Sequence, residues 1–137
     1  MEMSNWKGAA GVCINNQSEV LMVLQGPPDE EKKWGVPAGP PEADETLEQS
    51  CVREFSEMTG LEVRIIRSAG IKKDSFDNAD VSVELQYFLV EVVGGELTVW
   101  EEDPWIREIA WQPIVKLDTL EMADPGEVEM IRSLLQN

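Results

Sequence analysis

The segment that most constrains the fold is residues 46–60, which have the features of a short capped α-helix in a chain of strand-like runs. Thr46 and Gln49 form a capping-box pattern, in which the hydroxyl and the amide satisfy backbone N–H groups at the helix start. Gly60 suits the helix end, because glycine adopts the left-handed conformation at low cost. At 100° per residue, the apolar side chains of this helix fall on one arc. They are Leu47, Cys51, Val52 and Phe55.

The rest of the chain predicts a mixed β-sheet with this helix inside it and a second helix near the C-terminus. Gly8–Ile14 and Glu19–Leu24 are apolar runs separated by the turn residues 15–18, which predicts a β-hairpin. Further strands are expected at Trp34–Pro37, Leu61–Ile66, Val81–Val93, Leu97–Trp100 and Ile106–Trp111, with loops at 26–31 and 38–44. No repeat or linker interrupts the pattern, so residues 1–137 are expected to form a single domain.

The C-terminal helix has a clear predicted start. Asp124 is a favourable capping residue, proline follows it, and Glu127 places an acid in the first turn. The apolar face expected for this helix consists of Val128, Ile131 and Leu135.

The charge and residue composition exclude several classes of function. The chain has 27 acidic and 11 basic residues, a net charge of −16, and no basic run longer than a pair. Long nucleic acid is therefore not an expected partner, since binding rests on basic side chains that neutralise phosphates. Histidine is absent and the two cysteines form no CxxC pattern, which argues against histidine-based catalysis, a disulfide scaffold and a structural zinc site. No apolar run or leader pattern indicates a membrane, so the expected location is the cytoplasm.

Two acids on the predicted internal helix suggest a metal site. Glu54 and Glu57 are three residues apart and thus neighbours on one helix face, where two carboxylates favour a shared cation. Oxygen ligands without histidine or cysteine suit Mg²⁺ or Mn²⁺. A loop rich in proline and glycine precedes the helix and offers backbone groups to a metal or a phosphate. Taken alone, this pattern also fits a solvated acidic helix face.

The spacing of residues 39–61 resembles the Nudix box, G-x5-E-x7-R-E-U-x-E-E-x-G-U, where U is a bulky apolar residue. Gly39 is followed by five residues and Glu45, and seven more lead to the run Arg53-Glu54-Phe55-Ser56-Glu57-Met58-Thr59-Gly60-Leu61. The chain fills every fixed position of the pattern but one. The resemblance implies a MutT-like Nudix fold of the α/β class, with a mixed β-sheet sandwiched between helices.

The resemblance also implies roles for individual residues. Glu54 would be the central ligand of Mg²⁺ or Mn²⁺ and a candidate general base, and Glu57 a second ligand. Ala38 would offer its backbone carbonyl to the metal, while Gly39 would allow close approach of the loop backbone to the cofactor. Arg53 and Glu45 would orient the loop and the helix through a salt bridge. The implied activity is hydrolysis of the pyrophosphate bond in a small nucleotide: a nucleoside triphosphate, a nucleotide sugar or a dinucleotide.

The departures from the pattern leave a second function open. Met58 replaces the second glutamate of the pair, and Asp44 stands where many members have glycine. Met58 also extends the apolar stripe of the helix, as methionine commonly does. The alternative is thus a weakly active or inactive Nudix-fold module that binds a nucleotide or a protein partner. An acidic structural domain with a coincidental match is a third interpretation.

Several residues outside the box have two interpretations each. Glu101–Asp103 and Glu108 are either extra metal ligands or solvated surface, and surface is the favoured interpretation. Trp100 and Trp105 could stack on a base, but core or contact residues of a homodimer are favoured. Four lysines are expected to contact phosphate or to offset the negative surface; they are Lys32, Lys33, Lys72 and Lys73.

Overall fold

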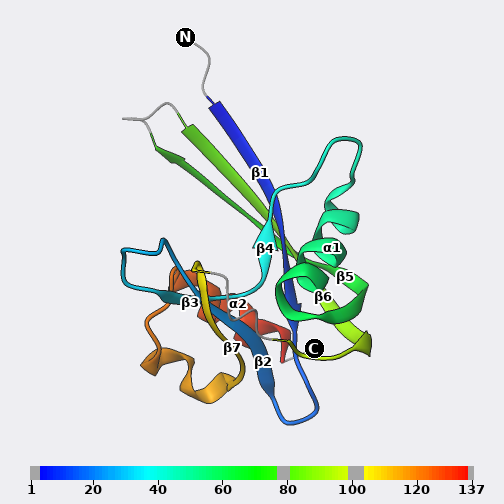
Figure 1. Cartoon of the computed structure of the whole chain (residues 1–137), viewed down its shortest axis with the longest axis vertical. Helices are drawn as coiled ribbons and strands as arrows, with labels where there is room; N and C mark the ends of the chain where they lie inside the picture. Colours follow the sequence, from blue (N-terminus) through cyan, green and yellow to red (C-terminus); the bar gives the residue numbers. More distant parts are fainter. Residues whose placement is uncertain (1–3, 77–80, 99–103, 136–137) are drawn as a thin grey trace.

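The structure, a computed structural model, describes residues 4–76, 81–98 and 104–135 (Figure 1). Its strands are β1 (Ser4–Cys13), β2 (Glu19–Gln25), β3 (Lys33–Gly35), β4 (Ala38–Gly39), β5 (Leu61–Phe76), β6 (Val81–Gly95) and β7 (Ile106–Pro113). Its helices are α1 (Leu47–Thr59), the 3-10 helix η2 (Ile114–Thr119) and α2 (Gly126–Leu134).

The strands form two sheets. One is a four-stranded mixed sheet in the order β4-β1-β6-β5, in which β1 and β6 run parallel and the other pairs antiparallel. The other is a three-stranded antiparallel sheet in the order β3-β2-β7. The chain passes from the second sheet to the first between β3 and β4, through Val36 and Pro37.

The prediction that the first two strands pair with each other as a hairpin is wrong. The turn at residues 15–18 is present, but β1 and β2 meet only at the bridge between Ile14 and Val20 and then separate into different sheets. The reason lies in the sequence, because both runs are continuously apolar rather than alternating. Val20 to Val23 are all fully buried, which suits a central strand covered on both faces.

Two apolar cores lie on opposite faces of the strands, one beneath each helix. In β1, Ala9 and Cys13 face the core under α1, which we call the α1-side core. Ala10 and Val12 belong to the other core, which also contains Val128 and Ile131 of α2; we call it the α2-side core. Alternate residues therefore serve alternate helices, which confirms the expected mixed sheet between helices.

Helix α1 forms as the sequence predicted. The Thr46 hydroxyl accepts a hydrogen bond from the Gln49 backbone N–H at 3.1 Å, and the Gln49 side chain accepts one from the Thr46 N–H at 2.9 Å. Gly60 ends the helix with φ 83° and donates to the Ser56 carbonyl. Cys51 and Phe55 are buried, while Leu47, Val52 and Met58 are partly buried against the same core.

Several predicted boundaries differ from the structure. Strand β5 runs ten residues beyond the predicted end at Ile66, because it is an edge strand whose polar side chains reach solvent. Residues 38–39, expected in a loop, form β4. The predicted strand at 97–100 is wrong at Leu97 and Thr98, since the Thr98 N–H donates to a helix-end carbonyl instead; Trp100 lies outside the described residues.

The C-terminal helix also departs in detail from its prediction. It begins at Gly126, whose backbone N–H donates to the Asp124 side chain at 3.0 Å. Val128 and Ile131 are buried as expected, but Leu135 is 43% exposed because it follows the last helical turn. Within the described ranges, no helix is long and apolar enough to cross a membrane.

Candidate functional site

Arg53 ties the loop before α1 to the helix itself. Its Nε donates to Glu45 Oε2 at 2.8 Å and its Nη2 to Glu45 Oε1 at 2.9 Å, which makes a two-pronged ion pair. The same Nη2 donates to the Pro40 carbonyl at 3.0 Å. Paired charged hydrogen bonds of this kind fix geometry as well as adding energy. Loop residues 40–45 are therefore held against one face of α1, as the sequence predicted for Arg53 and Glu45.

The remaining guanidinium nitrogen of Arg53 joins the two helix carboxylates. Nη1 donates to Glu54 Oε1 at 2.9 Å and to Glu57 Oε2 at 3.1 Å. The Glu54 side chain is 18% exposed and that of Glu57 is 58% exposed. We call Glu45, Arg53, Glu54 and Glu57 the carboxylate cluster. It forms a shallow site in which one acid is mostly covered and its neighbour faces solvent.

Arg53 sets the electrostatics of the cluster. Its hydrogen bonds to Glu45 lower the pKa of that carboxyl below the ordinary value, because a nearby cation favours the ionised form. In return Glu45, followed by Glu54, raises the pKa of the Arg53 guanidinium. Glu42 adds a longer ion pair to Nη1 at 3.5 Å. Glu45 and Arg53 are therefore both charged at neutral pH.

The backbone at Gly39 lies directly against the Glu54 carboxylate. A Cβ atom at this position would come within 2.3 Å of Glu54 Cδ and 2.6 Å of both carboxylate oxygens. Only glycine therefore lets β4 and the Glu54 side chain lie this close together. The buried Ser50 hydroxyl reaches the Gly39 carbonyl at 3.5 Å, so the helix contacts β4 at a second point.

Ser50 and Glu42 are site neighbours that the sequence analysis missed. Ser50 lies one helical turn before Glu54 on the same face, so its spacing could have identified it. Glu42 lies within the loop, where spacing carries no such information. Asp44 has φ 67°, the left-handed conformation that explains why glycine is common at this position. Aspartate tolerates it better than most residues.

The donor atoms suit a hard divalent cation but form an incomplete set. Within the described residues, no group of three or more histidine, cysteine, aspartate or glutamate side chains is arranged to hold a metal ion. Glu54 and Glu57 offer carboxylate oxygens on the same side of α1, and Ala38 precedes Gly39 in β4. Such oxygen donors fit Mg²⁺ or Mn²⁺, with water completing the shell. Met58 adds no oxygen donor, because its side chain is a thioether, and it is partly buried against the α1-side core.

The other predicted site residues lie apart from this cluster or make other contacts. Lys72 pairs with Asp124 and Lys73 with Glu84, while Lys32 donates to two backbone carbonyls. Trp105 is 52% exposed, so it is not a core residue, and the interpretations as a homodimer contact or a stacking residue stay predictions. Glu108 is exposed, as favoured, and residues 100–103 lie outside the described part of the chain.

Both cysteines are buried, as predicted for Cys51. Burial raises the pKa of the Cys13 thiol to about 11 and that of the Cys51 thiol to about 12. Both thiols are protonated at neutral pH and serve as small apolar side chains.

Comparisons with known proteins show which family this chain is similar to. A family model described as the NUDIX domain matches residues 5–134. A Mycobacterium tuberculosis protein named as the mutator protein MutT4 is 35% identical over 86 residues, covering 61% of this chain and 34% of that protein. A second relative, named as nudix hydrolase 1 of Caenorhabditis elegans, is 38% identical over 61 residues, 42% of this chain and 17% of its own length. The chain thus spans about a third or less of these relatives.

Solved structures share the fold at low sequence identity. A NUDIX hydrolase from Nitrosomonas europaea superposes with a TM-score of 0.81 at 22% identity, covering 97% of this chain and 90% of the other. The NUDIX domain of Shewanella oneidensis NrtR, solved with ADP ribose, gives a TM-score of 0.73 at 18% identity, covering 98% and 90%.

Proposed function

The chain belongs to the NUDIX domain family, and on this premise we propose that it hydrolyses the pyrophosphate bond of a small nucleoside diphosphate derivative. The observation that carries the proposal is the carboxylate cluster, in which one guanidinium holds the loop acid Glu45 and the helix acids Glu54 and Glu57. This arrangement leaves two acids side by side next to a backbone turn, as phosphoryl transfer assisted by a metal requires.

In this proposal Glu54, Glu57 and the Ala38 carbonyl would hold Mg²⁺ or Mn²⁺. When bound, such a cation neutralises charge on phosphate oxygens and orients water. Glu54 would be the central ligand, and its carboxylate would accept a proton from the attacking water. Arg53 and Glu45 position the helix and the loop, and Gly39 lets the backbone approach Glu54. The net charge of −16 repels an anionic substrate, and a bound cation would reduce this repulsion.

The substrate is a small nucleotide, and the open choices are a nucleoside triphosphate, a nucleotide sugar and a dinucleotide. The NrtR domain solved with ADP ribose supports a nucleotide ligand for this fold. The cytoplasmic location, the homodimer and the single domain over 1–137 stay predictions from the sequence.

A weakly active or inactive binding module is the second candidate function. It is favoured by Met58, whose side chain packs into the α1-side core in place of an expected carboxylate. Both candidate functions are compatible with the same fold, and a measurement of turnover distinguishes between them.

The deciding experiment measures phosphate and pyrophosphate release from a panel of nucleotides with Mg²⁺, with Mn²⁺ and with a chelator. Turnover is expected with metal only. Glu54→Gln is expected to lower it about 10²–10⁴-fold, the range for loss of a general base. Glu48→Gln is the matched control, because Glu48 is an exposed acid in the first turn of α1. Full activity of Glu54→Gln would remove Glu54 from the mechanism, and absence of turnover with every nucleotide would favour the binding module.

A further inference from the structure

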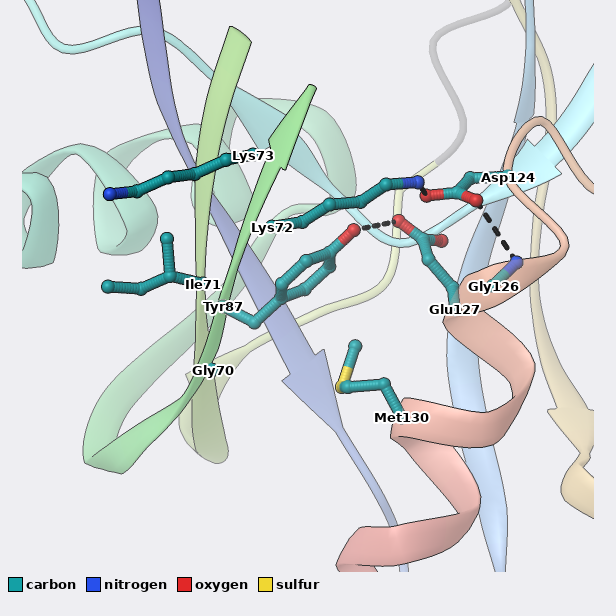
Figure 2. A pocket seen from close by; sticks show the side chains of 9 residues that line it. All are labelled: Gly70, Ile71, Lys72, Lys73, Tyr87, Asp124, Gly126, Glu127 and Met130. Atoms are coloured by element: carbon teal, nitrogen blue, oxygen red, sulfur yellow. Dashed lines mark hydrogen bonds and ion pairs between the residues drawn. The ribbon is translucent and has the colours of Figure 1, made fainter. Parts of the chain in front are cut away.

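The cavities outside the carboxylate cluster differ in how their charged groups are used. Figure 2 shows the one between the β5–β6 pair and the start of α2, where the Tyr87 hydroxyl donates to Glu127 and Lys72 forms an ion pair with Asp124. Both of these acids already have a partner. Another cavity, of about 380 Å³, lies at the end of the molecule where β1 passes into β2 (Figure 1). Its size is within the ~300–1,000 Å³ of typical small-molecule sites.

This second cavity, which we call the end cavity, has mainly apolar walls drawn from both sheets. The apolar side chains that line it are Ile14, Leu61, Val92, Leu97 and Trp111. Val92 and Leu97 are each 41% exposed, so part of this apolar surface is open to solvent. A ligand with an apolar body would gain free energy by covering it.

Glu91 supplies a negative charge to the same cavity. Its Oε1 accepts a hydrogen bond from Arg64 Nε, and its side chain is 44% exposed. Exposed ion pairs of this kind contribute little free energy, so a second cation can share the carboxylate at low cost. Burial is the main cause of the raised pKa of the Cys13 thiol, and the charge of Glu91 raises that pKa further. Because Cys13 also lines the cavity, the field of the carboxylate reaches the inner wall.

The end of α1 adds to the negative potential. Leu61, in the cavity wall, directly follows Gly60, the residue that ends the helix. A helix C-terminus carries a partial negative charge, which favours a cation nearby. The last turn of α1 contains no basic residue, so the helix does not neutralise this charge itself.

Trp111 gives the cavity a third feature that attracts cations. The face of an indole ring carries negative potential, and among aromatic side chains tryptophan binds ammonium groups best. Trp111 is partly buried against the α1-side core, so its ring is held in place by the packing around it. An anion would be repelled by Glu91 and by the net charge of −16.

We propose that the end cavity binds a small organic cation, namely a protonated amine with an apolar body. The ammonium group pairs with Glu91, and the body lies against Leu61, Leu97 and Trp111. The site does not depend on the proposed hydrolase activity, because it shares no residue with the carboxylate cluster.

The test is an NMR titration of the full chain at neutral pH with three probes of similar shape: phenethylamine, phenethyl alcohol and phenylacetate. The amine is expected to shift the amides of Leu61, Val92 and Trp111 saturably. It should bind about 3–10-fold more tightly than the alcohol, as a partly exposed ion pair and a cation–π contact would give. Phenylacetate should bind most weakly. Added salt should reduce the preference for the amine.

Two variants of one ion pair make the test specific. Glu91→Gln should lower the affinity for the amine to that for the alcohol, whereas Arg64→Gln should raise it about twofold, because Glu91 loses its competing cation. Both variants break the same Arg64–Glu91 contact, so a merely structural effect would move them in the same direction. Glu129→Gln is the matched control, since it removes an equal charge from an exposed position on α2 and should leave the affinity unchanged.

Three results would overturn the assignment. One is equal binding of the amine and the alcohol by the wild-type chain. Another is a set of amine-induced shifts centred on Glu54 and Glu57, which would assign the cation to the carboxylate cluster. The third is the absence of saturable shifts in a chain that sediments as a dimer, which would indicate that a second copy covers the cavity.

Discussion

Acidic side chains lie beside both α1 and α2, in opposite electrostatic settings. On α1, a guanidinium neutralises the acids, and Arg53 lowers the pKa of Glu45. On α2, Glu127 lies under the sheet next to a neutral hydroxyl, and burial raises its pKa. The comparison teaches that a nearby guanidinium favours the charged form of an acid, as it does for Glu45, whereas enclosure beneath the sheet disfavours the charged form, as it does for Glu127.

The largest effect is expected from a substitution that disturbs only the carboxylate cluster. Gly39→Ala would place a methyl group 2.3 Å from Glu54 Cδ, so the carboxylate must move. Misplacement by about 1 Å can cost ~10²-fold in rate, and overpacking typically costs about 1–3 kcal/mol of stability. We expect turnover to fall about 100-fold while the amide shifts of Gly126 and Glu127, which lie on the α2 side, stay at their wild-type values. Kinetics and NMR on the same variant measure both effects, and wild-type turnover would contradict the close approach.

A second change makes the α1 site more acidic. Met58→Glu should add the missing carboxylate and raise the affinity for Mg²⁺ by about tenfold or more, the lower end of losses seen when metal sites are perturbed. The opposing effect is packing, because Met58 is partly buried against the α1-side core, and a polar group there costs about 1–3 kcal/mol. Mg²⁺ titration of turnover, with thermal melting alongside, separates the two. A folded variant with unchanged metal dependence would show that position 58 faces no metal.

The smallest expected effect is the dependence of stability on pH, to which Glu45 and Glu127 should contribute with opposite signs. The pKa of Glu45 is lowered in the fold, so the stability it contributes is present above its ordinary pKa near 4.5 and is lost as pH falls through the lowered value. The pKa of Glu127 is raised, so its contribution is present below 4.5 and is lost as pH rises through the raised value. Asp124 raises that pKa, and the Tyr87 hydroxyl and Lys72 lower it.

Denaturant unfolding from pH 3 to pH 8 measures these slopes. Relative to wild type, Glu127→Gln should gain stability as pH rises above 4.5. Glu45→Gln should be less stable than wild type at neutral pH, and this difference should shrink as pH falls below 4.5. Parallel profiles for the two variants would contradict the contrast between the sites.

The sequence predicted α1 and its cluster because the information there is local. Capping residues, helical spacing and the Arg53 position all act within about fifteen residues. The hydrogen bond between Tyr87 and Glu127 on the α2 side is a long-range contact, since the two residues are forty positions apart. Glu127 could have been noticed on the helical wheel, because it precedes Val128 and lies one turn before Ile131, on the buried face. The sequence did not predict that β1 and β2 belong to different sheets, because two apolar runs joined by a turn also fit a hairpin.

The two cores beneath the helices have a consequence for how such a chain can change over time. Because successive residues of β1 face different helices, substitutions beneath α2 need not disturb the packing beneath α1. Mutational effects at separated sites without shared partners are usually additive. Lineages can therefore change the residues beneath α2 while the packing beneath α1 is retained, and an engineer can randomise residues 124–130 on a constant α1 background.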